Sequence, residues 1–208
     1  MKEADWLDWV DPRPMLRFLR LRASDRKLRL FACACCRLVW DHLPGDHVRR
    51  TVELGERYAE GLVLEVEMET ARREFNKAIA RERGVNARLA QAVAELLRAR
   101  FSPALVAERA RTGREAFLLQ WRQCDLLRDL FRPFRRVGGE PPWLAWKDGL
   151  VVKKALAIYE QRRWQDMPLL ADLLAEAGCA DDEVLSHCRG QGPQVRGCWV
   201  LDELLGRE

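Results

Sequence analysis

The residues best suited to chemistry stand in the stretch "FACACCRLVW", residues 31–40, which holds Cys33, Cys35 and Cys36. Thiolates bind metals and act as nucleophiles, so such a cluster suggests a zinc site or a redox pair. A tetrahedral zinc site needs four thiolate or imidazole groups that converge. Cys33 and Cys36, at i and i+3, could supply two of them. The other ligands would come from the C-terminal part of the chain, at His187, Cys188 and Cys198.

Helical geometry separates the three cysteines. Residues 26–43 predict one helix, and at about 100° per residue Cys35 shares an apolar face with His42, while Cys33 lies opposite, among arginines. Structural zinc sites usually combine two Cys-x-x-Cys pairs on turns, and the chain has no second pair. Free cysteine is one of the residue types most often buried. We therefore interpret the cluster as buried thiols, with His42 in the core and no cofactor, and keep zinc as the alternative.

A second chemical candidate is the segment "HCRGQGPQVRGC", residues 187–198. His187 and Cys188 resemble a base and a nucleophile, but adjacent side chains on a helix diverge by about 100°. The glycines resemble a phosphate loop that lacks the lysine and Ser/Thr of a P-loop. Arg189 and Arg196 are suited to hold an anion or the acidic side chains of a neighbouring helix. A metal-dependent or hydrolytic enzyme centred on 187–198 is the third of three functional hypotheses, and we favour a protein that is not an enzyme.

Helices are the elements that must position these residues. Ser24 is an N-cap for the helix over 25–43, and Ser102-Pro103 begins a long helix that extends to Phe131. No run of alternating β-branched residues has the quality of a hairpin. The sequence predicts an all-α fold, a bundle-like single domain of many helices.

The clearest break in the chain is Gly138-Gly-Glu-Pro-Pro142. It separates an N-terminal helical region, 1–136, from a C-terminal helical region, 143–208. Within the first region, residues 59–125 form a charged helical middle segment.

Charge is unevenly distributed along the chain, although the net charge is only +4. Residues 12–37 hold eight basic side chains against one acid, whereas residues 165–208 hold three arginines against nine acids. We expect the acidic C-terminal third to pair with the basic segments inside the molecule, through residues such as Arg29 and Arg37, because arginine binds carboxylates bidentately. The same asymmetry supports the second hypothesis, a nucleic-acid-associated accessory protein that uses the Arg-rich segments 13–37 and 98–136.

Composition excludes several classes of protein. With 48% hydrophobic and 33% charged residues, the chain is globular rather than disordered. Its apolar stretches are too short to span a membrane, and the acidic start "MKEADWLDWVD" lacks the apolar region of a secretory signal. An odd number of clustered cysteines argues against a disulfide framework, so we expect a reducing cytoplasm.

Eight tryptophans are many for 208 residues. Trp and Arg are both enriched at the hot spots of protein interfaces. The leading hypothesis is therefore a cytoplasmic protein that binds another protein, as an adaptor or accessory subunit, and that has no membrane partner. The candidate binding residues are Arg26, Arg29, Arg37, Arg189, Arg196 and Trp199.

Three motifs carry a resemblance to known sequences: "SDRKLRLFACACCR", "YEQRRWQDMPLLADLLAEAGC" and "VRGCWVLDELLG". They resemble a family of uncharacterised bacterial proteins, some of which are associated with SUKH-type or repeat-companion modules. The resemblance covers residues 1–58 and 126–208, and it implies no established activity. It does imply that these two ends pack together as one unit, with the middle segment as a variable insert.

Overall fold

The structure is a computed structural model that describes residues 2–80, 82–113, 115–135 and 142–207. Its described residues form twelve α-helices and three short 3-10 helices, and no strand. The predicted all-α fold is therefore confirmed. The chain divides into two compact units, residues 1–128 and 129–208, and each is described by itself below.

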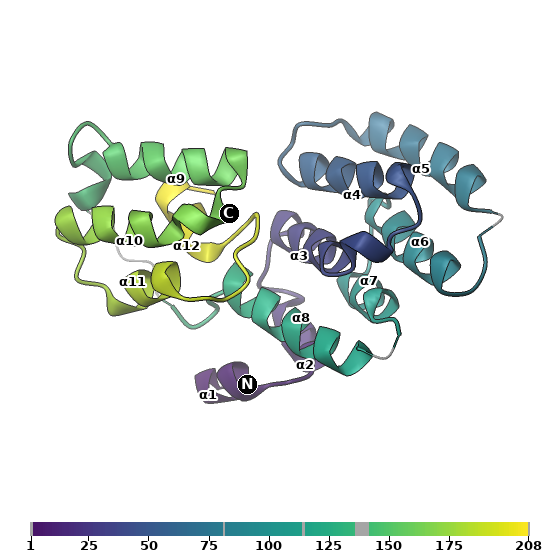
Figure 1. Cartoon of the computed structure of the whole chain (residues 1–208), viewed down its shortest axis with the longest axis horizontal. Helices are drawn as coiled ribbons and strands as arrows, with labels where there is room; N and C mark the ends of the chain where they lie inside the picture. The colour runs from purple at the N-terminus through teal and green to yellow at the C-terminus, as the bar shows by residue number, and fades with distance from the viewer. Residues whose placement is uncertain (1, 81, 114, 136–141, 208) are drawn as a thin grey trace. The chain divides into compact units, whose positions relative to one another are not determined.

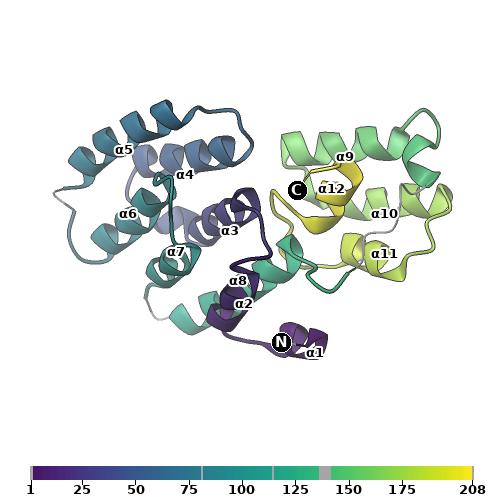
Figure 2. The same cartoon turned by 180° about the vertical axis from the view of Figure 1, so that it is seen from behind.

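Unit 1 is built around one central helix, α3 (Asp25–Arg37), which packs against α4, α6 and α7. Figure 1 shows these neighbours on several sides of α3, and Figure 2 shows them from behind. The other helices of this unit are α1 (Glu3–Asp8), α2 (Pro12–Leu19), α4 (Asp46–Ala59), α5 (Glu65–Ile79), α6 (Gly84–Leu96), α7 (Pro103–Ala110) and most of α8 (Ala116–Leu130).

The charged middle segment, residues 59–125, belongs to this same unit. It supplies α5, α6 and α7, and α6 and α7 bury apolar side chains beside α3. The middle segment is thus part of the core of unit 1. The expected packing of 1–58 with 143–208 stays a prediction, and the predicted break at 138–142 lies almost entirely outside the described residues.

Two predicted helix starts are confirmed by their caps. The Ser24 hydroxyl accepts a hydrogen bond from the Lys27 backbone N–H, and the Ser102 hydroxyl accepts one from Leu105. The predicted end of the helix over 25–43 is wrong, because α3 stops at Arg37 and residues 40–42 form a 3-10 turn. His42 leaves the helical register there and is exposed rather than in the core.

The predicted long helix from Ser102 to Phe131 is also two helices. α7 ends at Ala110 and α8 begins at Ala116. Gly113, between them, has a φ of +75°, which a residue with a side chain rarely adopts. This turn lets α7 and α8 run in different directions, and the groove described below lies beside it.

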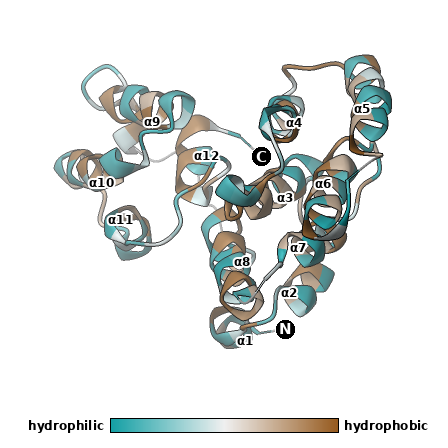
Figure 3. Ribbon diagram, turned by 45° about the vertical axis from the view of Figure 1, so that its right-hand side comes forward, coloured by the Kyte–Doolittle hydropathy of each residue, from teal (hydrophilic) through white to brown (hydrophobic). Residues whose placement is uncertain are grey.

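Unit 2 is a small helical bundle. It consists of α9 (Leu150–Gln161), α10 (Met167–Glu176), α11 (Asp182–Arg189) and α12 (Trp199–Leu205), with 3-10 turns at Pro142–Ala145 and Trp164–Asp166. α9 packs on α10 and α12, and α10 packs on α11. Fully buried side chains such as Tyr159, Leu170 and Leu201 form its core, and Figure 3 shows the hydrophobic turns of these helices.

Within the described ranges, the helices are too short or too polar to serve as membrane spans.

Candidate functional site

The cysteine cluster of α3 is buried on all sides. Cys33, Cys35 and Cys36 are each 1% exposed or less. Cys33, predicted among arginines, is buried because α4 covers that face, and its thiol lies 3.8 Å from the Val52 carbonyl oxygen. Burial raises the pKa of Cys36 to about 12 and that of Cys33 well above its ordinary value, so both remain thiols. The prediction of buried thiols is confirmed.

The arginines beside the cysteines have partners inside unit 1. Arg37 forms two hydrogen bonds to Glu56, the shorter 2.5 Å long, and Arg26 pairs with Glu60 at 3.1 Å. Arg29 is 3% exposed and donates to the carbonyl of Leu96, the last residue of α6, and to those of Arg98 and Ala99 just after it. The expectation that Arg29 and Arg37 pair with the acidic C-terminal third is therefore wrong, since α4 and the C-terminal end of α6 supply their acceptors.

Unit 2 brings three potential metal-ligating atoms together. Asp129 Oδ1 at the end of α8, His187 Nε2 on α11 and Cys198 Sγ before α12 all lie within 4.8 Å of one another. Nε2 is 3.1 Å from the sulfur and 3.2 Å from the carboxylate oxygen. The sequence predicted His187 and Cys198 as one group but missed Asp129, whose carboxylate only the fold brings there.

Trp199 fixes which ring nitrogen of the neutral His187 side chain carries the proton. Its indole Nε1–H donates to His187 Nδ1 over 3.1 Å, and the two rings meet edge to face. Indole nitrogen is a donor only, so Nδ1 must accept, and the proton of the neutral imidazole is on Nε2. That proton faces Asp129 and Cys198.

This arrangement does not form a nucleophilic triad. A Cys-His-Asp relay needs the sulfur at one ring nitrogen and the carboxylate at the other. Here both are at Nε2, and Nδ1 is occupied by Trp199. Burial and the neighbouring Asp129 charge raise the pKa of Cys198 well above its ordinary value, which opposes a thiolate.

The donor set has the composition of a zinc site, but its hydrogen bonds oppose a metal. A histidine that ligates through Nε2 carries its proton on Nδ1 and donates it to an acceptor. In this cluster Nδ1 faces the Trp199 donor instead. Zinc bound by Cys33, Cys36, His187, Cys188 or Cys198 stays a prediction. Among the described residues, the cluster that could hold a metal contains two of these five, His187 and Cys198.

The buried carboxylate of Asp129 instead fastens the glycine-rich loop to α8. Its Oδ2 accepts a hydrogen bond of 3.1 Å from the Val195 backbone N–H. Burial raises the pKa of Asp129, and the contacts with His187 and Val195 oppose that rise. The loop that resembled a phosphate site is thus held by an acid of the protein itself.

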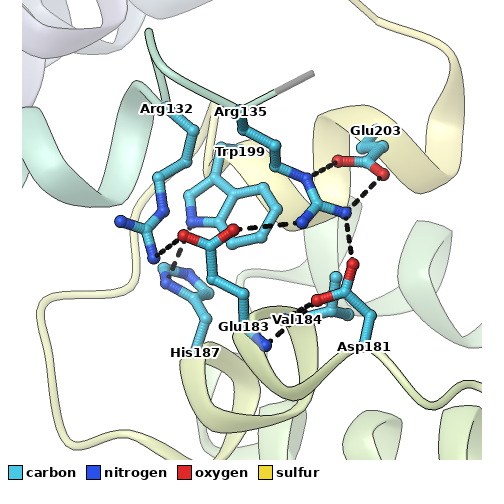
Figure 4. Close-up of polar contacts among 8 residues, drawn as sticks. All are labelled: Arg132, Arg135, Asp181, Glu183, Val184, His187, Trp199 and Glu203. Carbon is cyan, nitrogen blue, oxygen red and sulfur yellow. Dashed lines mark hydrogen bonds and ion pairs between the residues drawn. The ribbon is translucent and has the colours of Figure 1, made fainter. Parts of the chain in front are cut away.

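A second polar network surrounds Arg135. Its guanidinium contacts Asp181 at 2.8 Å and both Glu183 and Glu203 at 3.1 Å. Figure 4 shows Glu183 between Arg135 and Arg132. A guanidinium nitrogen of Arg132 lies 2.7 Å from the Glu183 carboxylate. The Trp199 ring lies beside both guanidinium groups. Basic residues of segment 98–136 therefore do pair with the acidic C-terminal third, at Arg132 and Arg135.

The remaining predicted binding residues also have partners. Arg189 forms an exposed ion pair with Asp172 at 3.1 Å. Arg196 donates to the Tyr159 carbonyl over 3.4 Å and lies over the Tyr159 ring. All six predicted binding residues therefore contact other parts of this chain: Arg26, Arg29, Arg37, Arg189, Arg196 and Trp199. Their role in binding a partner stays a prediction.

The most exposed aromatic residues lie elsewhere, on α8 of unit 1. Phe117 is 65% exposed, Trp121 47% and Leu118 44%. The rings of Phe117 and Trp121 are in contact, with centroids 5.3 Å apart and planes inclined at 54°. Figure 3 shows the hydrophobic start of this helix. Large aromatic side chains in water are an unfavourable arrangement unless another surface covers them.

Phe117 borders a groove of about 600 Å³. Its walls come from α2, α6, the α7–α8 turn and α8, and Phe117 belongs to them. Three arginines line it: Arg13, Arg88 and Arg111. Basic and aromatic side chains of the kind found at interface hot spots therefore meet at one exposed place.

Sequence reasoning missed this surface, although a signal was present. In α8 the buried residues Leu119, Gln123 and Leu126 follow helical spacing and form one stripe. Phe117 and Trp121, four positions apart, fall on the opposite side. Helical periodicity alone could thus have marked both rings as exposed.

Comparison of the sequence with protein-family models, and of the chain with curated proteins and with solved structures, finds no match. The class of protein is therefore defined by the fold and the surfaces alone, as an all-α protein of two compact units. The resemblance to a family of uncharacterised bacterial proteins stays a prediction.

Proposed function

We propose that this protein acts by binding another protein, as an adaptor or accessory subunit, through the surface formed by Phe117, Leu118 and Trp121. We call these three residues the α8 surface. The observation that carries the proposal is their exposure, because each is between 44% and 65% accessible although all are large and apolar. A buried aromatic side chain removes about 150–250 Å² from water, so covering the pair is a substantial source of affinity.

The polar chemistry of unit 2 supports a binding function rather than an enzymatic one. In this cluster Asp129 and Cys198 are buried and His187 is half-buried, and Trp199 holds the histidine in a tautomer that cannot relay a proton from cysteine to aspartate. The seven cysteines are buried and free. That state supports the proposed cytoplasmic location, since reducing compartments keep thiols unpaired.

The nucleic-acid hypothesis has weaker support. Several arginines of the segments 13–37 and 98–136 are already paired with carboxylates of the chain: Arg13, Arg26, Arg37, Arg98, Arg128, Arg132 and Arg135. Phosphate binding needs unpaired cations along one track. Paired arginines contribute little to such a track.

Site-specific photocrosslinking tests the proposal. A benzophenone amino acid replaces Leu118 in the full chain, expressed in the cells that normally make it. The matched control carries the same group at Leu169 of α10, which is 54% exposed and apolar but lies in unit 2. We expect a discrete crosslinked protein from position 118 alone, lost in the Phe117→Ala/Trp121→Ala variant.

Three results would contradict the proposal. Equal crosslinking at positions 118 and 169 would show that the α8 surface is not selective. An absence of any crosslink at position 118, in a variant that unfolds at the wild-type temperature, would show that nothing covers it. A crosslink between two copies of the chain would show that the α8 surface binds a second copy of this protein rather than a different protein.

A further inference from the structure

The groove beside the α8 surface has a definite chemistry, and we propose that it binds an acidic segment of the partner, with one carboxylate held by Arg88 and Arg111 and an adjacent apolar side chain on Phe117. This inference rests on the proposed function, since it names the chemistry of what the same surface would recognise. Four observations carry it.

The first observation is that two groove arginines have no carboxylate partner. Arg88 donates to the backbone oxygen of Glu108 over 3.2 Å, and Arg111 donates to the Gln120 side-chain oxygen over 3.1 Å. Neither forms an ion pair with any carboxylate of the described ranges. Each guanidinium has five N–H donors, so both keep donors for a ligand.

The second observation is that Arg111 is held in place before any ligand arrives. Gln120 accepts from Arg111 through its oxygen and donates through its Nε2 to the Val10 carbonyl, over 3.1 Å. The amide is thus oriented at both ends. A preoriented guanidinium loses less side-chain entropy on binding, which favours affinity.

The third observation is that Arg13, which lines the groove, already stabilises a neighbouring carboxylate. Asp11 accepts hydrogen bonds of 2.5 to 3.0 Å from Arg13, and this contact, with a smaller contribution from the Arg111 charge, lowers the pKa of Asp11. Glu108 is the one carboxylate that lines the groove beside its three arginines, and Asp11, just outside the lining, offsets Arg13. One positive charge remains in excess, which suits a single carboxylate better than a chain of phosphates.

The fourth observation is the apolar border of the groove. Val85 is 55% exposed and Phe117 65%, and both line it. A ligand that places a carboxylate at the arginines therefore has an apolar wall within reach. The combination fits an Asp or Glu next to Leu, Ile or Phe.

A phage library of random 12-residue peptides, selected on the immobilised full chain, tests the inference. We expect enriched peptides to carry Asp or Glu beside a large apolar residue. A synthetic peptide of the enriched sequence should bind at least about tenfold more weakly to Arg88→Gln or Arg111→Gln, because a charge-assisted hydrogen bond contributes this much. Its Glu→Gln version should lose the same factor on the wild-type chain.

The matched control is Arg109→Gln. Arg109 also donates to a backbone carbonyl, that of Gln91 at 3.3 Å, but it does not line the groove. Its substitution should leave peptide affinity unchanged. Glu108→Gln removes the carboxylate that lines the groove and should strengthen binding.

The inference is overturned if the enriched peptides contain no acidic residue, or if Arg109→Gln weakens binding as much as Arg88→Gln. It is also overturned if a 15-nucleotide thymidine strand binds more tightly than the peptide and loses affinity in Arg88→Gln, which would indicate a nucleic-acid site. If crosslinking from position 118 succeeds while the library yields no acidic peptides, the proposed function stands and only this inference fails.

Discussion

The polar cluster around His187 in unit 2 and the α8 surface in unit 1 are opposites. The first contains the residue types of catalysis and metal binding, and each of them contacts another group of the protein: Trp199 with His187, Val195 with Asp129, His187 with Cys198. The second contains no reactive group, yet its large side chains are exposed. Reactive residue types are therefore used inside unit 2 for contacts within the chain, whereas the exposed apolar side chains of the α8 surface are the ones left for the proposed partner.

The largest expected effect on stability is that of removing Arg135. Arg135→Ala leaves Asp181, Glu183 and Glu203 without their shared cation, and we expect it to lower the free energy of unfolding of unit 2 by about 2 kcal/mol. Hydrogen–deuterium exchange of the α12 amides measures this unit by itself. Arg189→Ala, which removes an exposed pair, should change it by less than about 0.5 kcal/mol.

Hydrogen–deuterium exchange of the α3 amides, in unit 1, tests the other side of the comparison. Phe117→Ala/Trp121→Ala should leave the stability of unit 1 within about 0.5 kcal/mol, because both rings are exposed. A loss as large as that of Arg135→Ala would show that the α8 surface is structural, and the contrast would be broken.

The second prediction concerns the tautomer of His187. In the wild-type chain, ¹⁵N NMR should find the proton on Nε2. Trp199→Phe removes the donor to Nδ1 and should lower the free energy of unfolding of unit 2 by about 1–2 kcal/mol. It should also strengthen zinc binding to the full chain, and His187→Ala in that background should abolish it. Stoichiometric zinc in the wild-type protein would refute the tautomer argument.

The third prediction addresses the cysteines as packing groups. A Cβ on Gly55 of α4 would lie 3.2 Å from the Cys33 sulfur and 3.6 Å from Leu96 Cβ. In a helix interior Ala is favoured over Gly by about 1 kcal/mol, and the close contact with the Cys33 sulfur opposes that gain, so Gly55→Ala should stabilise unit 1 by less than this amount, measured by chemical denaturation. When Cys33 is also replaced by Ala, Gly55→Ala should be more favourable. Equal effects with and without Cys33 would show that the sulfur is not what limits the space.

The smallest effect is a pH dependence in unit 2. Hydrogen bonds from Arg135 lower the pKa of Asp181 below its ordinary 3.8. The resulting stability is fully present above pH 3.8 and is lost as the pH falls through the lowered value. Asp181→Asn should flatten the acid side of the stability profile while Asn still caps α11. If wild type and variant lose stability in parallel, the Asp181 charge contributes nothing measurable.

Local patterns in the sequence predicted much of this molecule. Ser24 and Ser102 mark true helix starts because a hydroxyl at the N-cap satisfies a backbone N–H a few residues on. The ends of helices were harder to predict, since α3 stops at Arg37 and α7 at Ala110 without a proline.

Contacts between distant segments could not be predicted in the same way. Helical angles alone placed Cys33 on an arginine-bearing face, but burial depends on α4, which covers that face. Asp129 meets His187 and Cys198 only because the end of α8, α11 and the loop before α12 converge.

The sequence by itself determined the all-α fold, two of its helix caps and the absence of a disulfide framework, because these depend on spacing and composition within short windows. Only the tertiary structure decided which arginines pair with which distant acids, that Asp129 meets His187 and Cys198, and that Trp199 fixes the proton of His187. The physical reason is that hydrogen bonds and burial are pairwise and long-range in sequence, so they exist only once the helices have packed.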